Sequence, residues 1–366
     1  MFSFSKRLFM STVALSVWAA SGCVDDGARE PALPDVPVVH QTQYATVAIS
    51  EGNPHRICGG TLARIDRHVE AVSNILDVEP EPIEVYWYEE APNTSSASAY
   101  FAFAAIVTTE TSLLHELVHA ITIPVLGASL DYSREDIANA YEVGPTLLKD
   151  TLVPSENLGK EIHGSGHFSR WLIETRGPAP FRAFFGRSAT SADDLRGHIE
   201  DAYGMSLEDL EAEFFRTAPA WYSEVGACDG LERILWPEDE NRFSYEALTD
   251  CDSPSAFGHT GNEGAPYITA FVLELPEELV GRDFISPETP GWLTPCDIGE
   301  GPPGEQITPG ESGDVEPLFE GPVYEGLGYP LGTSFVNEFK RRLYRVEVPF
   351  SEDGEIASVA LELLDR

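Results

Sequence analysis

The stretch HELVHA, residues 115–120, is the part of the sequence from which the fold and the chemistry are most readily inferred. The residues before it, YFAFAAIVTT at 100–109, predict a strand. Apolar residues recur around HELVHA at helical spacing, which predicts a helix. Four positions along an α-helix make one turn plus about 40°, so His115 and His119 project from one face of that helix.

The helix is predicted to have two distinct faces. With His115 placed at 0°, His119 falls at about 40° and Glu116 at about 100° around the helix axis. The apolar residues fall between about 160° and 300°; they are Leu113, Leu114, Leu117, Val118 and Ile121. A pair of core histidines would lie inside the apolar stripe, whereas these two histidines lie outside it.

This arrangement of residue types fits a hydrolytic zinc site. Zinc accepts neutral imidazole nitrogens, and a catalytic zinc site keeps one position open for water, whose pKa it lowers. The motif assigns Glu116 as the general base, which takes a proton from the water and passes it to the leaving amine. We therefore predict that His115 and His119 are Zn²⁺ ligands. The alternative is a helix that carries two histidines by coincidence.

A third zinc ligand is required, and Glu142 is the candidate. The longer pattern HExxHxxGxxH is not present, because no histidine follows His119 at the required spacing. SREDIANAYEVGPTLL, residues 133–148, predicts a helix on which Glu142 faces away from the apolar residues. Glu135 and Asp136 are the fallback ligands, and the alternative for Glu142 is a solvated glutamate.

Together these residues resemble the gluzincin peptidases, in which a second helix carries a glutamate ligand. That ligand often stands in a Glu-Gly-x-Ala context, whereas this chain has Glu142-Val143-Gly144-Pro145, and Pro145 would disturb the helix just after the ligand. Three stretches extend the resemblance over about residues 44–217; they are RICGGTLARIDRHVE (56–70), SGHFSRWLIETRGPAPFRAFF (165–185) and SADDLRGHIEDAYGMSLEDLEAEFF (191–215). The resemblance implies a zincin-like domain that binds zinc and hydrolyses peptides or proteins.

The resemblance also implies a donor that stabilises the oxyanion of the transition state, for which His167 is the candidate, with His163 nearby. The alternative for His167 is a structural histidine in the core. Tyr141 and the aromatic residues of 168–185 are predicted to be core. The remaining histidines at 55, 68, 198 and 259 carry no motif and are predicted to lie at the surface.

The N-terminus reads as an export signal. Lys6 and Arg7 precede an apolar run that is too short to span a bilayer, so residues 1–22 are predicted to be a signal peptide. Ala20-Ser21-Gly22-Cys23 resembles a bacterial lipobox, which implies a lipid anchor at Cys23 and a place in the cell envelope, at the outer membrane. Residues 23–43 are then a flexible tether. The alternative is plain secretion, with Cys23 in a disulfide.

Charge excludes one class of partner. The formal net charge of −38 argues against binding to nucleic acid or to anionic lipid headgroups through the general surface, because both are polyanions. The carboxylates are better explained as a solvated, solubilising surface.

We predict an α+β fold in two domains. The zincin-like domain covers 44–221, and a mostly β, possibly sandwich-like domain covers 222–366, where prolines and glycines multiply and helical periods vanish. Without Cys23, four cysteines remain and predict two disulfides with three possible pairings, among which we prefer Cys228–Cys251 with Cys58–Cys296.

Three functions compete on these observations. The first is a lipid-anchored zinc metallopeptidase. The second is an inactive zincin-like binding protein of the envelope, which the Gly144-Pro145 departure favours. The third is an envelope structural or adhesion protein whose β domain carries the function.

Overall fold

The chain forms an α+β fold, as the sequence predicts. The computed structural model describes residues 37–53, 56–88, 104–107, 110–126, 137–138, 140–141, 162–185, 187, 192–219, 222–237, 240–258, 260, 266–286, 291–296, 329–331, 337–338, 341–351 and 353–364. Within Val36–Arg366 the contacts form one compact unit.

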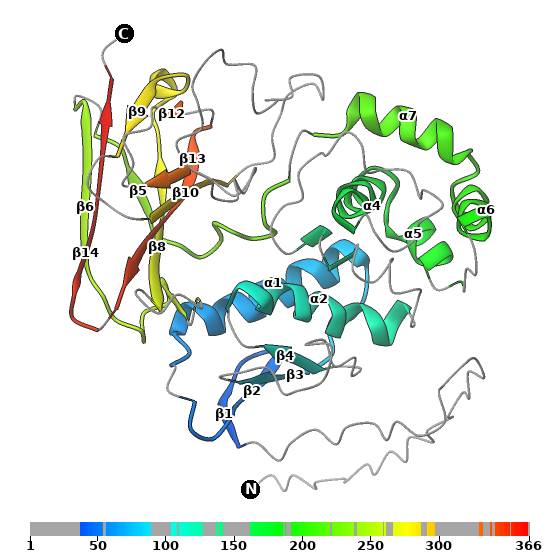
Figure 1. The fold of residues 1–366 in the computed structure, drawn as a ribbon, viewed down its shortest axis with the longest axis horizontal. Coiled ribbons are helices and arrows are strands. Elements are labelled where there is room, and N and C mark those ends of the chain that lie inside the picture. The colour runs from blue at the N-terminus through cyan, green and yellow to red at the C-terminus, as the bar shows by residue number, and fades with distance from the viewer. Residues whose placement is uncertain are drawn as a thin grey trace, which may run out of the picture. The chain divides into compact units, whose positions relative to one another are not determined.

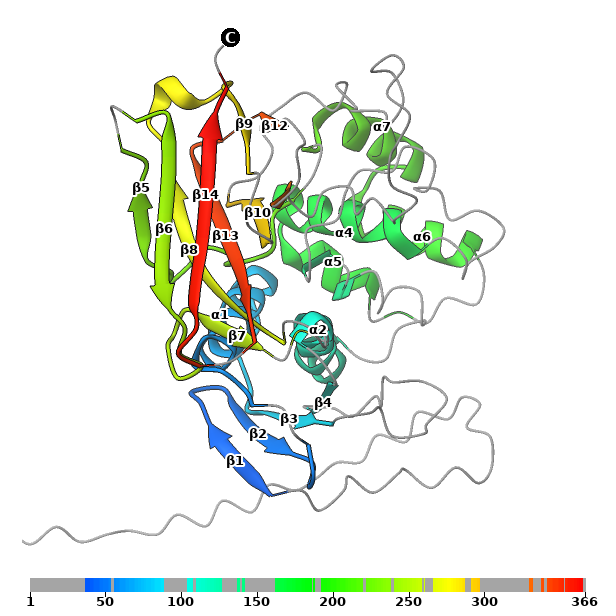
Figure 2. The ribbon, with the colours of Figure 1, turned by 60° about the vertical axis from the view of Figure 1, so that its left-hand side comes forward.

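The first part of this unit is a four-stranded sheet covered by helices (Figures 1 and 2). Its strands are β1 (Val38–Gln41), β2 (Ala45–Ile49), β3 (Ile83–Trp87) and β4 (Ala104–Val107), in the order β1-β2-β3-β4. β1 is antiparallel to β2, whereas β2, β3 and β4 run parallel. The parallel pair β2–β3 is joined by α1 (Gly59–Leu76), as such a crossover requires.

The HELVHA helix follows directly after the last strand of this sheet. It is α2 (Glu110–Leu126), and it packs against α1, β3 and β4. The alternation of β3 sends Ile83, Val85 and Trp87 into the core that the sheet shares with these helices. The strand predicted at 100–109 is confirmed over its described residues, Ala104–Val107.

Further helices complete this part. Residues 137–138 and 140–141 are helical and buried, and the later helices are α4 (Ile162–Arg176), α5 (Pro178–Phe185), α6 (Ala192–Tyr203) and α7 (Leu207–Thr217). α7 begins directly after a capping residue, Ser206, whose hydroxyl accepts a hydrogen bond from the Asp209 backbone N–H at 3.2 Å. The aromatic residues predicted as core are confirmed as buried; they are Phe168, Trp171, Phe181, Phe184 and Phe185.

From residue 233 onward, most of the described residues lie in strands, as predicted. The strands are β5 (Arg233–Leu235), β6 (Arg242–Leu248), β7 (Ala256–Gly258), β8 (Tyr267–Glu274), β9 (Asp283–Ile285), β10 (Gly291–Pro295), β11 (Tyr329–Leu331), β12 (Asn337–Glu338), β13 (Leu343–Phe350) and β14 (Ile356–Leu363), with a 3-10 turn η1 (Glu277–Leu279). One sheet has the order β11-β10-β13-β8-β5 with β7 also paired to β8, and the other has the order β12-β9-β14-β6.

These two sheets face each other as a sandwich (Figure 2). Their shared core takes Phe271 from β8 and Tyr344 from β13 on one side. It takes Phe243 from β6, Phe284 from β9 and Leu361 from β14 on the other. Buried residues alternate with more exposed ones along β14, which is the pattern of a strand that has one face towards the core and one face towards solvent.

Two disulfides form, as predicted, but the preferred pairing of the four cysteines is wrong. The bonds are Cys58–Cys251, with a Cα–Cα distance of 4.6 Å, and Cys228–Cys296, with a Cα–Cα distance of 5.7 Å. The preference for Cys228–Cys251 rested on their proximity in sequence. Cys251 instead lies against the first turn of α1, where Cys58 is the residue that precedes the helix.

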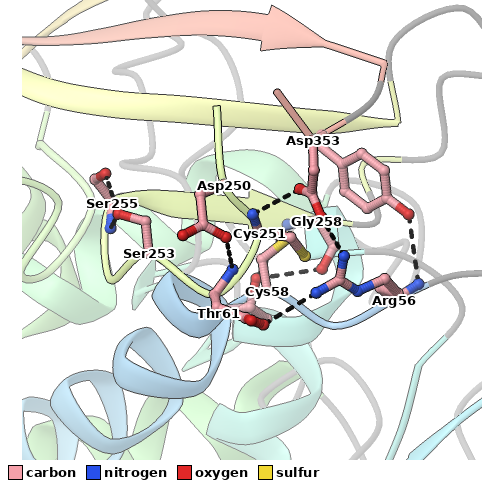
Figure 3. Close-up of a disulfide and its surroundings, with 11 residues drawn as sticks. Arg56, Cys58, Thr61, Asp250, Cys251, Ser253, Ser255, Gly258 and Asp353 are labelled. Atoms are coloured by element: carbon pink, nitrogen blue, oxygen red, sulfur yellow. Dashed lines mark hydrogen bonds and ion pairs between the residues drawn. A yellow bond between two sulfur atoms is a disulfide. The ribbon is translucent and has the colours of Figure 1, made fainter. Parts of the chain in front are cut away.

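The Cys58–Cys251 bond lies in a dense polar contact between α1 and the sandwich (Figure 3). The Gly59 N–H donates to the Cys251 carbonyl at 2.7 Å. The Thr61 hydroxyl accepts from the Gly258 N–H at 3.1 Å and lies 3.2 Å from the Gly258 carbonyl, to which it can donate. Arg56 pairs with Asp353 and Asp252 at the rim. Covalent and polar contacts therefore hold the first turn of α1 on the sandwich.

The N-terminal predictions fall largely outside the described residues. These include the signal peptide at 1–22 and the anchor at Cys23. The tether predicted for 23–43 is too long, because β1 already pairs with β2 from Val38. Among the described residues, no helix has the length and apolarity that a membrane crossing requires.

Candidate metal site

α2 presents its two histidines together. The apolar residues predicted to face the core are all buried; they are Leu113, Leu114, Leu117, Val118 and Ile121. His115 and Glu116 are half-buried, whereas His119 is 4% exposed. The helix thus buries its apolar stripe and leaves the edge of the His/Glu stripe accessible.

The imidazoles of His115 and His119 point their Nε2 atoms at each other. These atoms lie 3.0 Å apart, and the ring centroids lie 4.7 Å apart with the ring planes at 78°. Two nitrogens that bind one tetrahedral zinc at roughly 2.0–2.1 Å lie about 3.3 Å from each other. The observed separation is close to that value, so the pair fits two positions of a zinc site. A hydrogen bond between the two rings fits the same separation.

The third ligand candidate, Glu142, lies outside the described residues, as do Glu135 and Asp136. The described helical residues end at Tyr141, directly before Glu142, and Tyr141 is fully buried as predicted. Within the described part of the chain, no group of three or more His, Cys, Asp or Glu side chains is placed to hold a metal ion. The described donor set is therefore the histidine pair alone.

His167 is placed in the core. Its exposed fraction is 0%, and its ring lies 4.8 Å from the ring of Tyr222 and 5.2 Å from that of Phe214, between ring centroids. This environment favours the structural role that was the alternative for His167. Its role as a catalytic donor stays a prediction. The side chain of His163 lies outside the described part.

A second group of charged side chains lies between α1 and β13, and sequence reasoning missed it. Glu224 pairs with Arg64 of α1, through Nε at 3.0 Å, and with Arg345 of β13 at 3.7 Å. Burial acts to raise the pKa of the Glu224 carboxyl, but Arg64 and Arg345 outweigh it and hold that pKa below its usual range. The pair of ion contacts joins α1 to the sandwich a second time.

His68 belongs to the same group, and its predicted surface location is wrong. It lies on α1 and is 1% exposed. Burial lowers the pKa of its imidazole to about 4. The charge of Arg64 also lowers this pKa, whereas the carboxylate of Glu224 opposes the shift. No motif marks this position, and the only signal was its helical spacing with Ile65, Val69 and Val72, which are also buried.

The chain was compared with protein-family models, with curated proteins and with solved structures, and none of these comparisons finds a match. The function must therefore be argued from the chemistry of the residues themselves.

Proposed function

We propose that the protein is a zinc metallopeptidase, in which His115, His119 and Glu142 hold the metal and Glu116 is the general base. The observation that carries this proposal is the 3.0 Å separation of the two Nε2 atoms on the HELVHA helix. A hydrogen bond between the two rings is the competing explanation of this separation, and the zinc content of the protein distinguishes the two.

The side chains have separate tasks in the proposed reaction. When bound, zinc would activate a water molecule and polarise the peptide carbonyl. The Glu116 carboxylate would accept a proton from the attacking water and deliver it to the nitrogen of the leaving amine. A C–O bond forms and the peptide C–N bond breaks, which leaves a carboxylic acid and an amine. Since Glu116 is half-buried at the edge of the accessible stripe, a substrate could reach it.

The substrate is proposed to be a peptide or protein outside the cytoplasm. The signal-like residues 1–22 and the lipobox-like Cys23 support an enzyme attached to the bacterial cell envelope through a lipid. The net charge of −38 supports a substrate that is not nucleic acid. Replacing Cys23 by Ser should release the protein from the membrane fraction of expressing cells, and retention there would contradict the anchor.

Metal content and hydrolysis test the proposal together. The purified full chain should carry about one zinc per molecule by mass spectrometry. His115→Ala, His119→Ala and Glu142→Ala should lose it, and His198→Ala, which removes a histidine from α6, should keep it. Glu116→Gln should keep the zinc and lose hydrolysis of peptides.

Two outcomes would redirect the proposal. A folded wild type that takes up no zinc would mean that the two histidines only hydrogen-bond to each other. Zinc binding without hydrolysis of any peptide in the wild type would favour an inactive envelope binding protein, because the metal site would then be intact and unused.

A further inference from the structure

β6 is the longest strand at the edge of a sheet in the described part of the chain. It has seven residues, Arg242–Leu248, and it ends the order β12-β9-β14-β6, so its only described neighbour is β14 (Figure 1). The strands at the other ends of the described sheets have two to four described residues; they are β1, β4, β5, β11 and β12. Proteins usually keep such edges short or interrupt them with proline, because an exposed edge pairs readily with another strand. β6 contains no proline.

The backbone groups at the free edge of β6 belong to alternate residues. At the two ends of the strand, the Thr249 N–H donates to the Glu355 carbonyl at 2.9 Å and the Leu363 N–H donates to the Asn241 carbonyl at 2.8 Å. The odd-numbered residues of β6 therefore direct their N–H and C=O groups to β14, and the even-numbered residues direct theirs to the free edge. The side chains of these even-numbered residues are all exposed; they are Arg242, Ser244, Glu246 and Leu248.

The sequence of β6 is complementary to itself in one antiparallel register. If a second copy pairs with Ser244 opposite Ser244, the even-numbered residues form the hydrogen-bonded pairs that an antiparallel ladder requires. Arg242 of each copy then lies opposite Glu246 of the other copy on the solvent face, where opposite charges stabilise the pairing. On the face towards the core, the half-buried Tyr245 lies opposite Phe243 of the second copy, and aromatic cross-strand pairs also stabilise a sheet.

The registers on either side of this one are less favourable. One of them places Arg242 opposite Leu248, so the two charged side chains lose the partner directly across from them. The other places Glu246 opposite Glu240 of the second copy, and like charges directly opposite each other destabilise a sheet. The charges along the edge therefore favour a single register.

An exposed apolar pair lies beside the same edge. Leu248 of β6 and Ile356 of β14 are cross-strand partners, with exposed fractions of 72% and 67%. In the favoured register, Arg242 of the second copy lies diagonally across from Leu248. The aliphatic part of an arginine covers apolar surface while its charge stays in water. The pairing would therefore remove part of this apolar pair from solvent.

We propose that β6 is a docking edge for a second copy of this chain, which pairs with it antiparallel, Ser244 opposite Ser244, and joins the two four-stranded sheets into one. The net charge of −38 opposes the association of two copies. Salt at about 0.15 M screens charges that are more than about 8 Å apart, whereas cross-strand pairs lie within that distance. Association is therefore measured at that salt concentration.

Sedimentation equilibrium of the purified full chain tests the proposal, and the wild type should form a dimer. Arg242→Glu and Glu246→Arg each place like charges opposite each other at both ion pairs. Each should raise the dimer dissociation constant by about tenfold or more. An equimolar mixture of these two variants should associate as tightly as the wild type, because both pairs then join opposite charges again.

Two further variants separate the edge from general charge. Ser244→Pro removes an N–H that faces the free edge and none that bonds to β14, so it should abolish the dimer and leave the fold intact. Circular dichroism checks the fold of this variant. Arg216→Glu makes the same change of charge as Arg242→Glu at an exposed position of α7, and it should leave the dimer dissociation constant unchanged.

A wild type that stays monomeric throughout the micromolar range overturns the proposal. So does a dimer that survives Ser244→Pro, or one that Arg216→Glu weakens as much as Arg242→Glu does. A mixture of Arg242→Glu and Glu246→Arg that stays monomeric overturns it as well, because the register is then wrong. If Ser244→Pro does not fold, the charge variants decide the matter, since their side chains are exposed.

Discussion

Acid should destabilise this protein through His68, the histidine buried on α1. His68 is 1% exposed, and burial, with Arg64 and Arg170 acting in the same direction, lowers the pKa of its imidazole to about 4. Glu224 and the backbone of Leu114 oppose this effect but do not cancel it. In the unfolded chain the imidazole regains its ordinary pKa of 6.5, so it takes up a proton more readily there than in the fold.

The sign and the size of the effect follow from this difference. Above pH 6.5 the imidazole is neutral in both states and the fold has its full stability. As the pH falls from 6.5 towards 4, protonation of the unfolded chain draws the equilibrium away from the fold. The gap between 6.5 and about 4 corresponds to about 3 kcal/mol in total, of which about 2 kcal/mol is already lost at pH 5.

Urea unfolding followed by tryptophan fluorescence between pH 7.5 and pH 5 measures this loss. A chelator should be present throughout, so that release of a bound metal in acid does not contribute. His68→Gln should lose about 2 kcal/mol less than the wild type over this range. Ser73→Ala, at a buried position of the same helix, removes no titrating group and should follow the wild type. Equal losses in the wild type and in His68→Gln would refute the reasoning.

Three further tests probe the junction between α1 and the sandwich by urea unfolding. Replacing both Cys58 and Cys251 by Ser opens a bond that spans 193 residues and should cost about 4 kcal/mol; wild-type stability would contradict this. Gly60→Ala would drive a methyl group into a backbone carbonyl of the sandwich and should cost about 1–3 kcal/mol, whereas Gly197→Ala on α6, with open space around it, should not destabilise. Glu224→Gln removes the carboxylate that the half-buried Arg64 and the buried Arg345 share, while Arg345 keeps its ion pair with Glu347. It should cost about 3 kcal/mol, and a neutral effect would show that the ion pairs of Glu224 contribute nothing.

The fold was predictable where local periodicity and burial coincide. The alternation of IEVYW and the helical spacing of 61–76 each match an element of the structure, because the side that faces the core repeats with the period of the backbone. Short strands such as β5, β7 and β12 were not predicted. Each is only two or three residues long, and its pairing is set by a neighbour rather than by its own pattern.

The site was predictable to the extent that it lies on one helix. The meeting of His115 and His119 follows from a spacing of four residues, so the sequence alone indicated it. Arg170 of α4 is buried against Tyr222, which lies 52 positions away in the chain and outside any helix or strand. The sequence of α4 does not show that Arg170, which stands between Phe168 and Trp171, is buried, because arginine side chains are normally exposed to solvent.

The close approach of another backbone at Cys58 did leave a trace in the sequence. Cys58 is followed by Gly59 and Gly60, and two glycines are poor residues for the first turn of a helix. The two glycines are needed because a Cβ at Gly59 would lie 2.6 Å from the carbonyl oxygen of Asp252. A Cβ at Gly60 would lie even closer to the carbonyl oxygen of Ala256. A pair of helix-disfavouring residues beside a cysteine therefore marks the point where another backbone approaches. Proximity along the chain ignores that cost, and so it favoured the wrong partner for Cys58.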